Sequence, residues 1–267
     1  MDDSKSGLTD IKSRVHHFDC EFVAMPTNGA NELNRKFATL LADISSEGVQ
    51  DNETKIFKSP TDVDAFVAES AFLKALSDRA PWLDAPSVSS AYQQHWVSTG
   101  KPTWAPPQEQ RPSADHFKPV SEIRPGASAS WRETGGLYSS TATDTFVGMW
   151  RNFLDDDSCS GLHPRPWSTW RLEVGSNAKV HSIRTATDWV ELLNAHGSNS
   201  GGIARVNWAS VARIWDAVHF TPRAIVAVEG YRFETLMGLS VPVYWDVEST
   251  YWLRWCFDAV ELVNFER

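Results

Sequence analysis

The sequence predicts an α+β fold. Its C-terminal domain is expected to contain a split, mostly antiparallel β-sheet with flanking helices. A small helical region is expected to precede this domain. Three observations support this prediction. Helical apolar spacing dominates the first hundred residues, short strands and helices are expected to alternate in the later part, and six prolines from Gly100 to Pro125 separate the two patterns. We therefore expect a helical accessory region at 1–110 and an α+β catalytic domain at 111–267.

The expected N-terminal elements are amphipathic helices. Apolar spacing predicts one helix at 31–46, a second from Ser59 to a point before Pro81, and a third through Val88–Val97. No chemical motif accompanies them, so this region is expected to serve packing or recognition.

The C-terminal part is expected to contain several short elements of both types. The predicted strands are His116–Val120, Gly136–Thr141, Thr169–Val174, Lys179–Ile183, Asp216–Thr221, Ala224–Val228 and Ala259–Phe265. The predicted helices are Asp144–Leu154, a segment capped by Thr185 or Thr187, and Trp208–Ile214 capped by Asn207. The glycine-rich phosphate-binding patterns of doubly wound nucleotide folds are absent from the sequence.

Composition and charge are those of a globular protein, with 42% apolar and 22% charged residues. No apolar run approaches the ~20 residues that a membrane-spanning helix needs, and no signal peptide is recognised. We therefore expect a cytoplasmic protein that does not act in a membrane. The net charge of −9 disfavours nonspecific nucleic-acid binding. Cys20, Cys159 and Cys256 lack C-x-x-C spacing, so neither a disulfide framework nor a metal site is expected.

The first candidate for chemistry lies at 242–257, where Asp246, Glu248, Ser249 and Thr250 interrupt a run of aromatic residues. At least one carboxylate there must lie against aromatic rings. Such a carboxylate is costly unless it is hydrogen-bonded or neutralised, so it often has a use. The alternative is that the aromatic residues are core and that Glu248 caps a helix from the surface.

The second candidate is Gly135-Gly136-Leu137-Tyr138-Ser139-Ser140-Thr141, ahead of a predicted helix. Strand alternation puts Tyr138 and Ser140 on one face, and the hydroxyl side chains offer hydrogen bonds near a helix start. The alternative is an ordinary strand-to-helix junction, because hydroxyl residues favour helix caps for structural reasons.

Gly-Gly-Leu-Tyr-Ser-Ser-Thr resembles the strand of the ADP-ribosyltransferase superfamily in which a tyrosine, or a Ser-Thr-Ser run in the toxin branch, lines the nicotinamide pocket. In that superfamily an early His or Arg holds the NAD ribose and a late Glu is catalytic. The resemblance implies these roles for His116, for Tyr138 with the Ser139–Thr141 run, and for Glu248. Arg124 or Arg132 would be the alternative in the arginine branch.

The chemistry explains why these residue types are needed. Cleavage of the nicotinamide–ribose bond develops positive charge on the ribose, which the Glu248 carboxylate would stabilise. Aromatic side chains stack on the nicotinamide cation; Tyr138, Trp150 and Trp252 are the candidates. His116 and Ser140 would bind the ribose and the carboxamide, and the reaction needs no metal.

The resemblance therefore implies an NAD-dependent ADP-ribosyltransferase that modifies a macromolecular acceptor, protein or nucleic acid, as a toxin or defence effector. A non-enzymatic, tryptophan-rich module that binds a ligand or protein is the alternative. His219 is expected to be hydrogen-bonded within the core rather than paired with Asp216, because strand alternation puts these two side chains on opposite faces.

Overall fold

The computed structural model describes the following parts of the chain: residues 15–16, 19, 38, 56–57, 59–84, 92–98, 111–122, 136–144, 146–154, 165–242, 245 and 247–266. The predicted helix at 31–46 lies outside this part, apart from Ala38, which is helical. Among the described residues, no helix combines the length and the apolar character needed to cross a bilayer.

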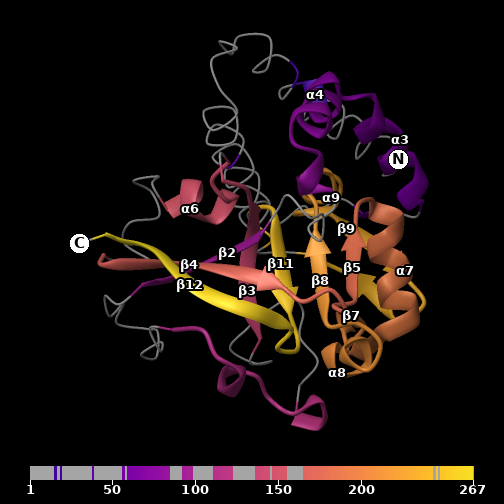
Figure 1. Cartoon of the computed structure of the whole chain (residues 1–267). Helices are drawn as coiled ribbons and strands as arrows, with labels where there is room; N and C mark the ends of the chain where they lie inside the picture. The colour runs from indigo at the N-terminus through magenta and orange to yellow at the C-terminus, as the bar shows by residue number, and fades with distance from the viewer. Residues whose placement is uncertain are drawn as a thin grey trace.

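The fold is α+β, with two sheets (Figure 1): the larger is mostly antiparallel, and the smaller is mixed, because β1 pairs with β9 and β10 with β7 in parallel. The larger sheet has the strand order β12-β4-β2-β3-β11-β8-β5. Its strands are β2 (Tyr92–Ser98), β3 (Leu137–Ala142), β4 (Trp167–Val174), β5 (Val180–Ile183), β8 (Ala217–Phe220), β11 (Ser249–Trp252) and β12 (Phe257–Glu266). All its pairings are antiparallel except that of β5 with β8.

The smaller sheet has the strand order β1-β9-β10-β7-β6. Its strands are β1 (Ile56–Phe57), β6 (Gly197–Ser200), β7 (Ile203–Val206), β9 (Arg232–Thr235) and β10 (Gly238–Ser240). The sequence patterns did not predict these short strands.

The described helices are α3 (Pro60–Glu69), α4 (Ala71–Arg79), α6 (Met149–Leu154), α7 (Ala186–His196), α8 (Trp208–Ala212) and α9 (Pro222–Val228), with 3₁₀ turns η1 (Pro81–Leu83), η2 (Ala114–His116) and η3 (Val120–Glu122). Four of the described helices, α4, α7, α8 and α9, begin at a side chain that caps them. Thr185 and Asp188 form a capping box at the start of α7, and Asn207 accepts a backbone hydrogen bond at the start of α8.

The helix predicted from Ser59 to a point before Pro81 is two helices, α3 and α4, which are separated at Ser70, and the helix predicted at Asp144–Leu154 begins only at Met149. Three other element predictions were wrong. The predicted strand Ala224–Val228 lies in α9, because Thr221 caps this helix and Pro222 occupies its first turn. His116–Val120 is not a strand: His116 ends the 3₁₀ turn η2, Val120 begins η3, and the residues between them form no regular element. The helix predicted through Val88–Val97 is strand β2 where it is described. An apolar run without clear periodicity does not distinguish a buried helix from a buried strand.

The two faces of the larger sheet have different surroundings. The helix face carries Val218, Phe220 and Tyr251, which join a core cluster that includes α3, α4, α7, α8 and α9. The opposite face, which we call the network face because it carries the hydrogen-bond network described below, includes Leu137, Ala217 and Trp252. These residues belong to a second, smaller cluster. Helices α7 and α9 lie beside β8 and β5 in Figure 1, with α3 and α4 next to them.

The region before residue 110 shares both the sheet and the core with the rest of the chain. Strand β2 pairs with β3 on one side and with β4 on the other, so it is an inner strand. Helix α3 contacts α7 and α9, and its Val63 and Val67 join the helix-face core. The described residues therefore do not divide near residue 110 into a helical accessory region and a separate domain.

Candidate functional site

Glu248 lies at the start of β11, and its side chain is 0% exposed. The backbone N–H of Thr141 donates to Glu248 Oε2 at 3.0 Å, and the Thr141 hydroxyl donates to Oε1 at 2.8 Å. The His219 Nε2 lies 2.9 Å from the same Oε1. Residue 141 and residue 248 are brought together because β3 and β11 are neighbouring antiparallel strands.

The hydrogen bonds on this face form one directed chain that ends at Glu248. The Trp252 Nε1–H donates to Ser139 Oγ at 2.7 Å, and Ser139 donates to the Gln93 side-chain oxygen at 2.6 Å. The Gln93 amide then donates to Thr141 Oγ1 at 3.1 Å. Each hydroxyl accepts one bond and donates the next, an arrangement in which the bonds strengthen one another.

Thr141 contacts the Glu248 side chain with two donors, its backbone N–H and its hydroxyl, whereas the role of the His219 nitrogen depends on the tautomer of the ring. Thr141 Oγ1 accepts from Gln93, so its own hydrogen points to Glu248. His219 fits this environment with its proton on Nε2, while its Nδ1 lies 3.4 Å from the hydroxyl of Ser182. The site is thus a carboxyl group held in a water-poor surrounding, and a carboxylate held in this way is suited to stabilising positive charge on a bound group.

The other predicted site residues on β3 and α6 lie on the helix face. Tyr138 is half-buried and stacks on Tyr251, with ring centroids 4.7 Å apart. The rings of Trp150 and Trp245 meet Tyr138 edge-on at 6.5 and 6.2 Å. Burial raises the pKa of the Tyr251 hydroxyl, which therefore stays neutral. These rings form an aromatic cluster behind the sheet from Glu248, so they do not surround its carboxylate.

Ser140 connects the two faces without joining the carboxylate. Its hydroxyl donates to the backbone carbonyl of Glu248 at 2.9 Å and accepts the backbone N–H of Trp150 at 3.0 Å. These two hydrogen bonds connect the start of α6 to the residue that precedes β11, so the role of Ser140 in this geometry is structural.

The predicted site residues are therefore divided. The structure brings Ser139, Thr141 and Trp252 together with Glu248, and it leaves Tyr138, Ser140 and Trp150 on the other face. The side chain of His116, together with Arg124 and Arg132, lies outside the part of the chain that is described.

Two members of the network, Gln93 and His219, were not predicted as site residues. His219 was expected to be hydrogen-bonded in the core, as it is, but its partner was not foreseen. The available signal was the alternation of β8, which puts His219 on the face opposite its apolar neighbours Val218 and Phe220. Gln93 gave no signal, because its segment was predicted as a helix.

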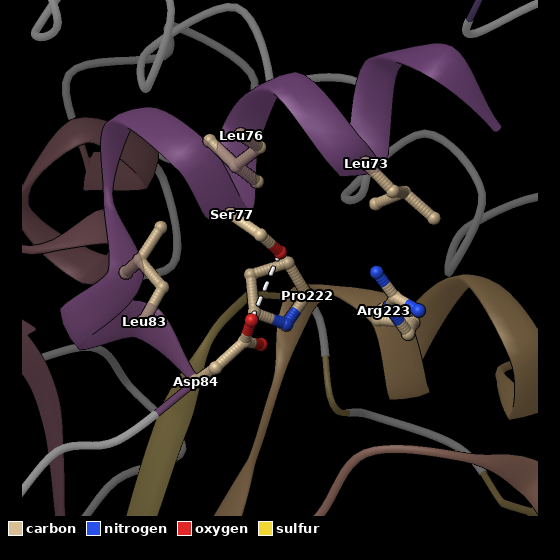
Figure 2. A pocket seen from close by; sticks show the side chains of 7 residues that line it. All are labelled: Leu73, Leu76, Ser77, Leu83, Asp84, Pro222 and Arg223. Atoms are coloured by element: carbon tan, nitrogen blue, oxygen red, sulfur yellow. Dashed lines mark hydrogen bonds between the residues drawn. The ribbon is translucent and has the colours of Figure 1, made fainter. Parts of the chain in front are cut away.

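A small hollow lies elsewhere, between α4, η1 and the start of α9 (Figure 2). Its lining residues are Leu73, Leu76, Ser77, Leu83, Asp84, Pro222 and Arg223. The hydroxyl of Ser77 donates to Asp84 across it at 2.9 Å. Its volume is about 10 Å³, room for one water, whereas ligand pockets occupy about 300–1,000 Å³. This hollow is a packing defect rather than a nucleotide site.

The described residues offer neither a reactive thiol nor a metal site. Burial raises the pKa of Cys256 to about 12, with the nearby Asp216 carboxylate adding to the effect, so this thiol is a poor nucleophile at neutral pH. No cluster of three or more His, Cys, Asp or Glu side chains with the spacing of a metal site occurs among the described residues.

Comparisons with known proteins returned no match to a family model, a curated protein or a solved structure.

Proposed function

We propose that this chain is an NAD-consuming ADP-ribosyltransferase in which Glu248 is the catalytic carboxylate. The observation that carries the proposal is the contact between Thr141 and Glu248. The two motifs that resemble the superfamily are 107 residues apart, and their side chains are directly hydrogen-bonded. The hydroxyl run and the late glutamate therefore have the proximity that a common site requires.

The division of the site residues favours the branch with a hydroxyl run over the branch with a tyrosine. Ser139 and Thr141 share the network face with Glu248, whereas Tyr138 is on the other face. The NAD site of this proposal is accordingly formed by Ser139, Thr141, Trp252 and Glu248. Because Glu248 is fully buried, NAD reaches it only when the groups above the network face move aside.

In the reaction, the Glu248 carboxylate faces the positive charge that develops on the ribose as nicotinamide leaves. Thr141 and His219 donate to Oε1 and Thr141 N–H donates to Oε2, so the carboxylate needs little reorganisation. The ring of Trp252, which is fully buried and packed against Phe257, would stack on the nicotinamide once the same movement uncovers it. A macromolecular nucleophile, from a protein or a nucleic acid, then takes the ADP-ribose, as in a toxin or defence effector.

The test is NAD cleavage by the full chain and by Glu248→Gln, followed through release of nicotinamide. We expect turnover to fall roughly 10²–10³-fold in the variant, as for loss of one preorganised electrostatic group. The KM for NAD should change little, because the charge acts in the transition state. Glu229→Gln is the matched control, since Glu229 is also 0% exposed but lies outside the network. Equal turnover by Glu248→Gln and wild type would remove Glu248 from the mechanism.

A second candidate function is a non-enzymatic module that binds a ligand or protein. It is favoured by one observation: both oxygens of Glu248 are hydrogen-bonded inside the protein and its side chain is closed to solvent. In this case Glu248→Gln lowers the free energy of unfolding by about 1–3 kcal/mol, because its amide group meets the Thr141 donors. Wild-type protein that neither cleaves nor binds NAD would select this candidate.

A further inference from the structure

His219 holds Glu248 from the side opposite Thr141. The strand order β3-β11-β8 puts Glu248, at the start of the middle strand, between the two neighbours. The Thr141 hydroxyl on β3 donates to Oε1 from one side, and His219 Nε2 on β8 lies 2.9 Å from the same oxygen on the other side. The carboxylate thus contacts side chains from two strands, and both strands are held in place by the sheet.

The imidazole of His219 is itself fixed. The backbone of His219 pairs with Thr250 of β11 on one side and with Ser182 of β5 on the other. The ring is 0% exposed, and its two nitrogens face Glu248 Oε1 at 2.9 Å and Ser182 Oγ at 3.4 Å. Both nitrogens are occupied by protein groups, so the ring is arranged to hold the carboxylate and not to contact a substrate.

A glutamate side chain needs such a constraint because three rotatable bonds separate its carboxylate from the backbone. Hydrogen bonds from Thr141 alone leave Oε1 held from one strand only. Displacing a reacting group by about 1 Å can cost 10²-fold in rate. A second donor on the opposite strand fixes the oxygen against that displacement.

We propose that His219 is a positioning residue that sets the orientation of the Glu248 carboxylate for the reaction. This inference rests on the proposed ADP-ribosyltransferase function. It adds His219 to the site, although neither motif contains it, and it assigns Ser182 to fixing the ring through Nδ1.

The variants His219→Leu and His219→Gln test the proposal in the full chain. Leucine fills much of the space but donates nothing, so kcat for NAD cleavage should fall about 10²-fold while the KM stays close to wild type. The glutamine amide can donate to Oε1, so His219→Gln should recover most of the lost kcat. Glu229→Gln, a buried substitution outside the network, controls for general loss of stability.

A second measurement needs no folded leucine variant. In wild-type protein with isotope-labelled histidine, NMR should show a bound proton on His219 Nε2 that exchanges slowly and shifts in Glu248→Gln. His219→Gln identifies the signal by its disappearance.

Each outcome decides the proposal. Rescue by glutamine together with the Nε2 proton supports it. Wild-type kcat in His219→Leu, failure of a folded His219→Gln to exceed His219→Leu, or a His219 Nε2 without a proton would overturn it while leaving the ADP-ribosyltransferase proposal standing. If the wild-type protein does not cleave NAD, both the ADP-ribosyltransferase function and the positioning role of His219 are overturned. The wild-type assay is done first, so this result precedes any measurement on a variant.

Discussion

At the scale of single residues, Gln93 has the most demanding position in the network. Its amide oxygen accepts from Ser139 and its amide nitrogen donates to Thr141, and the side chain is fully buried. No other side chain of similar size presents a donor and an acceptor in this way. Gln93 therefore connects the Trp252 end of the chain to the carboxylate end.

We predict that Gln93→Leu lowers the free energy of unfolding by about 1–3 kcal/mol, because the Ser139 hydroxyl loses its buried acceptor. Denaturant unfolding monitored by tryptophan fluorescence measures this. Tyr92→Phe is the control on the same strand: it removes a half-buried hydroxyl that donates to the Thr143 carbonyl and should cost only about 0.5–1.5 kcal/mol. Wild-type stability in Gln93→Leu would show that the chain of hydrogen bonds is not a stabilising unit.

At the scale of elements, the start of α7 connects the N-terminal helices to the sheet. The Asp64 carboxylate, on α3, accepts the backbone N–H groups of Ala186 and Thr187 at 2.6 and 3.0 Å. It also accepts the Thr187 hydroxyl. A carboxylate at a helix N-terminus satisfies unpaired donors and matches the helix dipole. One side chain therefore couples α3 to α7 across more than a hundred residues of sequence.

We predict that Asp64→Ala destabilises the protein by about 1–3 kcal/mol, since helix-start donors lose a charged acceptor. Glu69→Ala removes the same charge from the exposed end of the same helix, and it should change stability by no more than about 0.5 kcal/mol. Thermal unfolding followed by circular dichroism compares the two. Equal effects would mean that net charge, rather than the contact with α7, is responsible.

At the scale of the whole molecule, strand β2 determines whether the C-terminal part can fold alone. A fragment that begins at Ser113 lacks β2, α3 and α4. Its sheet would have unpaired edges at β3 and β4, and its helix-face core would lose Val63, Val67 and their neighbours.

We predict that this 113–267 fragment does not unfold cooperatively, in contrast to the full chain. Thermal melts and the dispersion of amide signals in NMR spectra measure the difference. A fragment with a sharp transition and dispersed signals would instead show that the part after residue 112 has a sufficient core of its own.

The α+β class and the elements whose ends carry local signals could be predicted from the amino-acid sequence. Strand β8 follows from an apolar, β-branched run, and α7 and α8 follow from their caps at Thr185 and Asn207. The motifs also drew attention to Ser139, Thr141 and Glu248. These signals are local, so one sequence suffices to read them.

Only the tertiary structure decided how these residues meet. The pairing of Thr141 and His219 with Glu248 depends on the order β3-β11-β8 and on the register that sets Thr250 opposite both Ser139 and His219. A shift of one residue in register turns every side chain of a strand to the other face. The separation of Tyr138 from Glu248 and the inner position of β2 have the same cause: strand order and register are set by packing over the whole sheet, not by neighbours in sequence.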